Sequence, residues 1–205
     1  MWILLVCLYD DDAVQLVDVT EPRRPALLAR LSHAVGGFAA LRAPTAAALL
    51  RVDGGRTLLA LVTSEAAGIA AGAPGGGLQV INMTNPASPS ALAAVARTAG
   101  PKPEWPMLAG ASAVAALTHG NCTLALVAGY HAHGLQLVNL TDPAHPKDGG
   151  TIEHGAGGAR LRSPIDVQIV RVGGVPFAFV AASVDDTVSV IRLNTSAALL
   201  SECWG

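Results

Sequence analysis

The sequence has little charge, few aromatic residues and only three cysteines. Lys, Arg, Asp and Glu make up 14% of the 205 residues and leave a net charge of −2, so no basic surface for nucleic acid is expected. Hydrophobic residues make up 51%, which excludes a disordered chain. No apolar run approaches the roughly 18 residues that a membrane-spanning helix requires, so no transmembrane segment is expected.

The cysteines Cys7, Cys122 and Cys203 show neither a CxxC pair nor the spacing of a metal site. Their small apolar side chains suit a buried core. In an oxidising compartment they allow one disulfide and one free thiol. The sequence leaves their disulfide state open.

The apolar start of the chain, Trp2 to Tyr9, is not typical of a secretory signal peptide. It lacks a basic region, and three aspartates follow where a cleavage site would stand. Residues 3–20 instead align without gaps on residues 124–141. We therefore expect a strand from the middle of a repeat unit, so that the chain is a fragment or begins late in its gene.

A nine-residue phrase recurs along the chain and predicts a repeat architecture. Three strong copies begin 64 and 57 residues apart, and a weaker copy follows 53 residues later. They read VQLVDVTEP (14–22), LQVINMTNP (78–86), LQLVNLTDP (135–143) and VSVIRLNTS (188–196). Alternating side chains with apolar groups on both faces predict a strand covered on both sides.

Other strands are predicted around each copy of the phrase. The segments 49–62, 114–127 and 167–180 are each two apolar runs around a polar, mostly Gly-containing turn, the pattern of a β-hairpin. After the phrase comes an acidic or amide residue with Pro-x-x-Pro, which ends the strand, and then a shorter strand. Four antiparallel strands, A to D, in each unit of roughly 50 residues are typical of a β-propeller blade.

The repeated phrase and its Pro-x-x-Pro turn resemble the LVIVD-repeat family. The resemblance covers nearly the whole chain, although the fourth copy departs at Arg192 and has no Pro-x-x-Pro after it. It implies a β-propeller, often secreted or at the cell surface, without shared catalytic residues.

The expected fold is therefore a single all-β domain, residues 1–205, a β-propeller of about four blades of four antiparallel strands. The first blade lacks its inner strand A. Either the four blades close a small ring, or, as we prefer, they form part of a larger one. The blades are expected at about 2–32, 44–95, 110–152 and 164–204.

In this fold the B–C and D–A loops share one side, which becomes the candidate ligand face because binding groups cluster on such loops. Its candidate residues are Asp11, Asp12, His131, His133, His154, Arg160, Arg162, Asp185 and Asp186. The histidines could bind Zn²⁺ or Cu²⁺, the aspartates Ca²⁺ and the arginines an anion. We favour ordinary polar loop residues, and we expect no cofactor, a metal ion being the weaker alternative. No motif for nucleophilic catalysis is present.

The favoured function is a non-enzymatic binding or scaffold module for a protein or small ligand on the loop face. The open blade edges would provide a second surface through which the protein associates with a partner. The alternatives are a metal-dependent hydrolase or lactonase-like enzyme and a truncated product of a larger propeller. Four N-x-[ST] sequons favour a secretory, extracellular or cell-surface location. They are Asn82, Asn121, Asn139 and Asn194.

Overall fold

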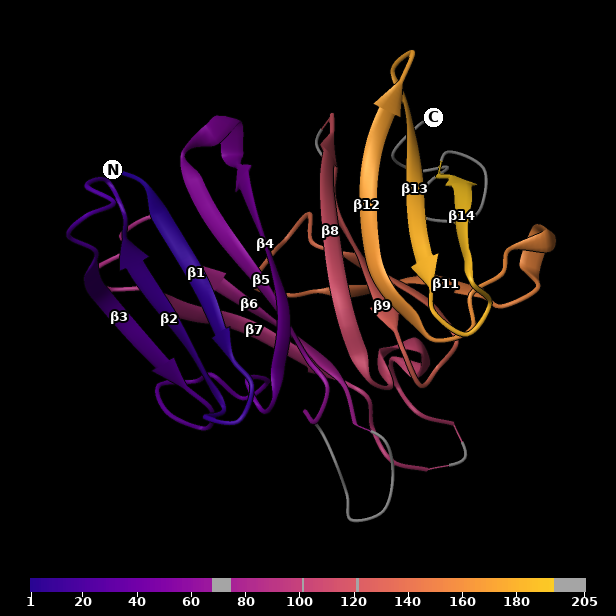
Figure 1. Cartoon of the computed structure of the whole chain (residues 1–205), viewed down its shortest axis with the longest axis horizontal. Helices are drawn as coiled ribbons and strands as arrows, with labels where there is room; N and C mark the ends of the chain where they lie inside the picture. The colour runs from indigo at the N-terminus through magenta and orange to yellow at the C-terminus, as the bar shows by residue number, and fades with distance from the viewer. Residues whose placement is uncertain (68–74, 101, 121, 194–205) are drawn as a thin grey trace.

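In a computed structural model, which describes residues 1–67, 75–100, 102–120 and 122–193, the protein is built from β-strands (Figure 1). Fourteen strands and three single-turn 3₁₀ helices (Asp53–Gly55, Pro106–Leu108 and Ala156–Gly158) make up the regular structure of the described residues. No helix in these ranges is long and apolar enough to cross a membrane. The all-β prediction is confirmed.

The strands form four antiparallel sheets, which we number I to IV in chain order. Sheet I contains β1 (Ile3–Leu8), β2 (Ala13–Asp18) and β3 (Ala26–Ser32). Sheet II contains β4 (Pro44–Val52), β5 (Thr57–Ser64), β6 (Gly77–Asn82) and β7 (Ser90–Ala96). Sheet III contains β8 (Ala111–His119), β9 (Cys122–Gly129), β10 (Gly134–Asn139) and β11 (Lys147–Glu153). Sheet IV contains β12 (Pro164–Val172), β13 (Val175–Ala182) and β14 (Thr187–Arg192).

Within each sheet, strands that are neighbours in the chain are also hydrogen-bonded neighbours. The hairpin predicted for 49–62 is present as β4 and β5, with Leu49 opposite Ala60. Its turn places Gly54 at φ 64° and Gly55 at φ 91°, which glycine tolerates without strain. The repeated phrase forms β2, β6, β10 and β14, and each of these strands pairs with the strand that directly precedes it in the chain.

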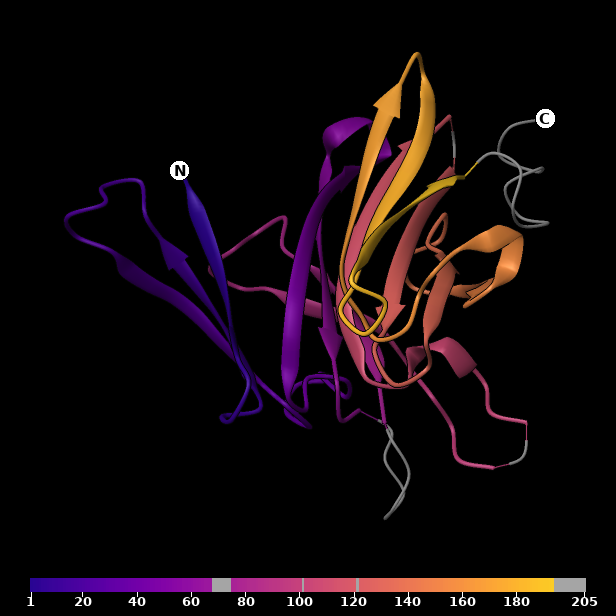
Figure 2. The same cartoon turned by 45° about the vertical axis from the view of Figure 1, so that its right-hand side comes forward.

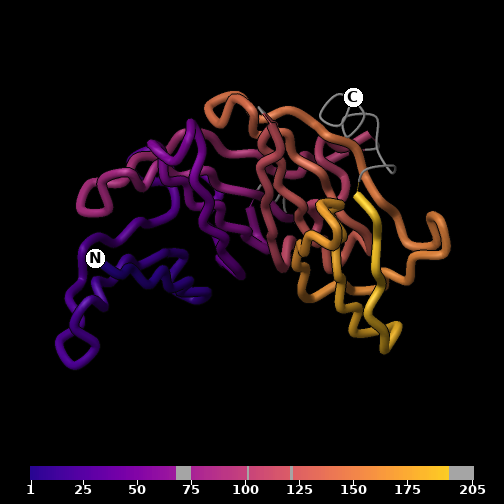
Figure 3. Tube along the Cα trace, turned by 90° about the horizontal axis from the view of Figure 1, so that it is seen from above, coloured from indigo at the N-terminus to yellow at the C-terminus, as the bar shows by residue number. Residues whose placement is uncertain are grey.

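The four sheets lie side by side in an open arc, with sheets I and IV at its two ends (Figure 3); in Figure 2, sheet IV comes to the front of the row. Strands β4, β8 and β12 contact one another in series, and β1 contacts β4. The turns after β4 and β12 lie at one end of the sheets, at the top of Figure 1. The architecture is thus a row of sheets packed face to face.

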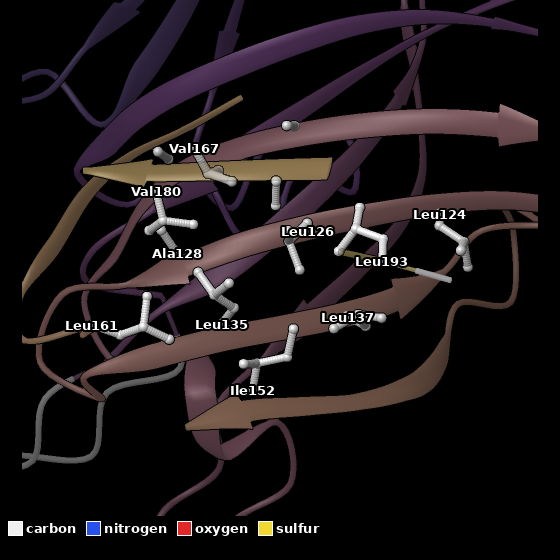
Figure 4. Packing of buried hydrophobic residues seen from close by; sticks show 13 residues of the cluster. Leu124, Leu126, Ala128, Leu135, Leu137, Ile152, Leu161, Val167, Val180 and Leu193 are labelled. Carbon is white, nitrogen blue, oxygen red and sulfur yellow. The ribbon is translucent and has the colours of Figure 1, made fainter. Parts of the chain in front are cut away.

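A hydrophobic cluster fills each of the three junctions between successive sheets. The first junction, between sheets I and II, contains Val14, Leu16, Leu31, Phe38, Leu41, Ala60, Val62, Ile81 and Met83. The second, between sheets II and III, contains Leu61, Leu78, Val80, Val95, Leu108, Ala111, Val114, Ala125, Val127, Val138 and Leu140. The third, between sheets III and IV, is drawn in Figure 4 and contains Ala113, Ala115, Leu124, Leu126, Ala128, Leu135, Leu137, Ile152, Leu161, Val167, Ala178, Val180 and Leu193.

Burial along the strands reflects the position of each sheet in the row. Almost every residue of β5 and β9 is buried, because sheets II and III are covered on both faces. Residues of β13 alternate between buried and half-buried, although its sequence is equally apolar. Sheet IV is therefore covered on one face only by the described part of the chain.

Each junction is also closed by a leucine from the loop that connects the two sheets. Leu41, Leu108 and Leu161 are fully buried, each in a different junction. Each lies three residues before the first residue of the next sheet, Pro44, Ala111 or Pro164. We call these three residues the plug leucines. They bury apolar surface that strands alone would leave at the end of the junction.

We expect burial at a junction to decide the cost of a leucine truncation. Leu61→Ala removes a fully buried side chain of the second junction and should lower the free energy of unfolding by about 2–5 kcal/mol. Leu49→Ala, in the paired strand β4 but 47% exposed, should cost less than about 1 kcal/mol. Urea unfolding measures both changes, and equal costs would contradict the packing described here.

The cysteines differ in state. Cys122 is disulfide-bonded, and Cys203 lies outside the described residues. Cys7 is a free thiol of β1 that packs against the first junction. Burial raises the pKa of Cys7 to about 11, because the thiolate loses its hydration there.

Cys7 should therefore react slowly in the folded protein. At pH 8 a thiol with a pKa of about 11 is only about 0.1% thiolate, which is the reactive form. We expect Ellman's reagent to label it at least about 100-fold more slowly than in denaturant. The Cys7→Ser variant subtracts labelling at any other thiol. Rapid labelling of the native protein that disappears in Cys7→Ser would show an exposed thiol instead.

Candidate functional site

In sheets I and III, the loop inside the sheet and the loop that leads to the next sheet meet on one side of the row. The backbone N–H of His33 donates to the Asp12 carbonyl at 2.9 Å, and that of His154 donates to the His133 carbonyl at 3.0 Å. These loops correspond to the predicted B–C and D–A loops. Most of the candidate residues therefore lie within one surface, which we call the loop face.

Two candidate residues hold neighbouring sheets together. The Asp12 carboxylate accepts the backbone N–H of Ala43 at 2.8 Å, and His133 Nδ1 accepts that of Ser163 at 3.0 Å. Each donor lies just before the first strand of the next sheet. We call Asp12 and His133 the latch residues. In sheet II the latch is a backbone group, because the Gly75 carbonyl accepts the N–H of Gly110 at 2.6 Å.

The latches limit the chemistry of these side chains. Asp12 and His133 have positive φ values of 50° and 56°, which turn their side chains toward the next sheet. His133 Nδ1 accepts a hydrogen bond, so in the neutral imidazole the ring proton is on Nε2 and neither nitrogen offers a free lone pair to a metal. Asp186 has the same backbone conformation, with φ 51°, but is exposed and makes no side-chain hydrogen bond to the described residues.

Asp185 collects several other candidates at the third junction. Its side chain is only 4% exposed; Oδ2 accepts the backbone N–H of Arg162 at 2.9 Å and lies 3.3 Å from His154 Nδ1. His154 Nδ1 also accepts the N–H of the plug residue Leu161 at 3.0 Å. The hydrogen bond from Arg162 lowers the pKa of Asp185. Burial opposes this, and the charges of Arg160 and Arg162 add to the lowering.

A second polar cluster crosses three sheets and was not foreseen from the sequence. Glu65 accepts a hydrogen bond from the Tyr9 hydroxyl at 2.7 Å and lies 3.4 Å from His131 Nε2. The bond to Glu65 raises the pKa of Tyr9. The ring of Tyr130 lies edge-on to His131, with centroids 5.1 Å apart. Tyr9 and Tyr130 occupy the same repeat position, and that was the one signal available in the sequence.

This cluster borders a small hollow at the inner end of the loop face. It has a volume of about 190 Å³ and is lined by Thr45, Glu65, Gly110, Ser112 and Tyr130. Its carboxylate and hydroxyl groups can bind a polar ligand. A larger hollow, of about 640 Å³, lies between β11 and β14 and includes Arg160 in its lining.

The candidate residues thus separate into different environments. Asp11 pairs with Arg30 at 3.0 Å in an exposed ion pair, and the backbone N–H of Arg160 donates to Ser189 Oγ at 3.0 Å. His131, His133 and His154 each have a different set of partners. Within the ranges that the structure describes, no three or more His, Cys, Asp or Glu side chains are placed to hold a metal ion.

Two of the sequon asparagines have a structural use. Asn82 Oδ1 accepts the backbone N–H of Thr84, and Asn139 Oδ1 accepts that of Thr141, both at 2.9 Å. Asp18 does the same for Thr20 at 2.8 Å. This Asx turn ends the strand formed by the repeated phrase. It explains why the same position is Asp in one copy and Asn in the other two, since both side chains can accept this hydrogen bond. Asn121 and Asn194 lie outside the described residues, and glycosylation stays a prediction.

Comparisons with known proteins carry no information on function. No protein-family model matches the sequence, and no curated protein matches it either. Among solved structures, the chain is similar to the crystal structure of a functionally unknown protein from Desulfotomaculum acetoxidans. The two have 8% sequence identity and a TM-score of 0.40, and the match covers 92% of this chain. The chain spans 65% of the length of that structure.

We expect the charge of Asp185 to stabilise the third junction. Its pKa is lower in the folded chain than its ordinary value, so the stabilisation is complete at pH 7 and is lost as the pH falls through that lowered pKa. Asp185→Asn should lower the Tm at pH 7 by about 2–4 °C, and the difference should shrink below pH 4. Thermal unfolding followed by circular dichroism between pH 7 and 3 measures it.

Asp186→Asn is the matched control. It removes the same charge from the adjacent, exposed residue, and Asn tolerates the positive φ there. Its Tm should stay within about 1 °C of the wild type. Equal effects of the two variants, or a difference that persists unchanged at low pH, would show that the Asp185 carboxylate does not act through its charge.

Proposed function

We propose that this protein is a non-enzymatic module of a β-propeller, of the LVIVD-repeat type, that binds a protein or small ligand through its loop face. Strands β4, β8 and β12 lie side by side at one edge of the row, as inner strands of propeller blades would. The repeated phrase provides the third strand of each full unit. The row of four sheets then corresponds to part of a ring.

The observation that carries the proposal is that neighbouring loops on this side are fixed to each other. The latch residues Asp12 and His133 bind the chain that enters the next sheet, and Asp185 binds the backbone of Arg162 in the loop that enters its own sheet. Loops fixed in this way lose little conformational entropy when they bind a partner. The Glu65 cluster and its hollow then offer a preformed polar contact at the centre of the face.

The disulfide at Cys122 supports the extracellular or cell-surface location that we propose, since disulfides persist in oxidising compartments.

The hydrogen bonds of the polar loop residues support a non-enzymatic role. Asp12, His133 and Asp185 accept hydrogen bonds from backbone groups, which is a structural role.

The test is selection of binders from a random-peptide display library on the intact protein. Peptides that bind the loop face should lose at least about tenfold in affinity for Glu65→Ala and His131→Ala. His145→Ala is the matched control. His145 lies at the opposite end of the sheets, in the turn after β10, with a side chain that is 79% exposed. Its affinity should stay within about twofold of the wild type.

Two results would overturn the proposal. The first is that selected peptides bind equally well to the Glu65→Ala and His131→Ala variants and are lost with His145→Ala. The second is stoichiometric metal in the purified protein, by mass spectrometry, together with an ester or lactone hydrolysis that His131→Ala abolishes. That outcome would favour the hydrolase alternative.

A further inference from the structure

Both ends of the row present an apolar sheet face that no described part of the chain covers. On the outer face of sheet IV, Val188 and Val190 are 61% and 56% exposed. On the outer face of sheet I, Leu4 is 50% exposed and Val6 and Val17 are half-buried. Apolar clusters of this kind on a soluble protein mark contact surfaces.

Alignment of the repeat units indicates which kind of surface the outer face of sheet IV contacts. Phe177 and Phe179 in β13, with Val188 and Val190 in β14, align with Leu124, Leu126, Leu135 and Leu137 of sheet III. Those four leucines are at most 3% exposed, because they pack against sheet IV in the third junction. The outer face of sheet IV therefore has the residues of a junction without the sheet that would complete it.

The outer face of sheet I corresponds to the other half of a junction. Leu4 and Val6 in β1 align with Ala125 and Val127, and Val17 in β2 aligns with Val138. Those three residues of sheet III are buried against sheet II in the second junction. The same positions of sheet IV, Ala178 and Val180, meet sheet III in the third junction.

A polar group on the same face supports this equivalence. The buried Gln79 amide accepts the N–H of Ala40 and donates to the Ala93 carbonyl, and Gln136 binds Met107 and Gly150 in the same way. Their donors come from the loop before each sheet. Gln15 occupies this position in sheet I, is half-buried, and makes no side-chain hydrogen bond to the described residues. A covering chain would satisfy it.

We infer that sheet IV of one copy of this protein binds sheet I of a second copy. The two outer faces are the two halves of one kind of junction, and they lie at opposite ends of an arc, so one copy cannot join them to each other (Figure 3). A second copy always carries the matching half. The contact is head to tail, with β13 and β14 against β1 and β2, and two copies can close on each other or continue into a chain.

The same strands already form the apolar centre of the third junction. There, Leu124 and Leu126 of β9 and Leu135 and Leu137 of β10 face Ala178 and Val180 of β13 (Figure 4). In the contact between copies, Phe177, Phe179, Val188 and Val190 take the place of the four leucines. Leu4 and Val6 take the place of Ala178 and Val180.

Light scattering and sedimentation of the intact protein test this inference. The wild type should have a mass of at least twice 20.7 kDa at about 50–100 μM. Leu4→Asp and Val190→Asp each place a charge on one outer face, and each should yield the 20.7 kDa monomer. Both positions are exposed in the single copy, so the circular dichroism spectrum of the folded variants should be unchanged and their Tm should fall only by the stabilisation that association adds to the wild type. Val35→Asp, 63% exposed in the loop before β4, is the control and should keep the wild-type mass.

A mixture of the two variants distinguishes a head-to-tail contact from any other. Leu4→Asp keeps an intact sheet IV, and Val190→Asp keeps an intact sheet I. An equimolar mixture should therefore recover a dimer with one intact contact. A monomeric wild type, oligomers that both variants leave unchanged, or a mixture that stays monomeric would each overturn the inference. The inference rests on the proposed arrangement of repeats and not on the loop face, so its failure would leave the peptide-binding test unaffected.

Discussion

The structure depends on the burial of apolar sheet faces against neighbouring sheets: sheets II and III bury both faces, and sheets I and IV bury one. A single sheet of this sequence cannot bury either face within itself, so its stability comes from the sheets on its two sides. This constraint accounts for the repetition of the phrase, in which side chains that point in opposite directions are both apolar. It also accounts for the contrast between β9, buried on both faces, and β13, buried on one. Whether a residue of a sheet is buried therefore depends on whether another sheet covers the face on which it lies.

Packing of apolar sheet faces stabilises the row but does little to fix the orientation of one sheet relative to the next. Polar contacts at the loops fix that orientation. At the first and third junctions a plug leucine, Leu41 or Leu161, fills the end of the junction, and a latch residue binds the backbone two residues further on. The donor N–H groups of Ala43 and Ser163 would otherwise lack a partner at a crowded loop. The plug contributes apolar burial, while the latch fixes the direction in which the next sheet begins.

Much of the fold could be predicted from the sequence, because the repeat compares the chain with itself. The hairpin of β4 and β5 follows from two apolar runs around Gly54 and Gly55, and the end of β2 follows from Asp18 and the prolines after it. The chemistry of the loop face could not be predicted. Asp12 and His133 are similar in role although they differ in residue type, and both bind the backbone. A search for metal-ligating side chains does not detect that role.

The contact of Glu65 with Tyr9 and His131 was missed for a related reason. It joins residues of three sheets, and their distances depend on how far each sheet is turned from the next. Sequence periodicity specifies which residues face a junction and contains no information on that rotation. The plug leucines, in contrast, had a detectable signal: each is a leucine that lies three residues before the first strand of its sheet. Repeat comparison extended into the loops would have found them.

The division of polar residues between structure and surface determines where binding can occur. A ligand that binds His133 through Nδ1 must first break the hydrogen bond from the Ser163 N–H, so the net gain in free energy is small. Glu65 and His131 are different, because their side chains are 37% and 44% exposed and are oriented by each other. Such groups bind a partner without loss of a sheet contact. New partners are therefore expected to bind through the loop-face side chains that make no latch contact. The latch contacts hold the loops that carry these side chains in place.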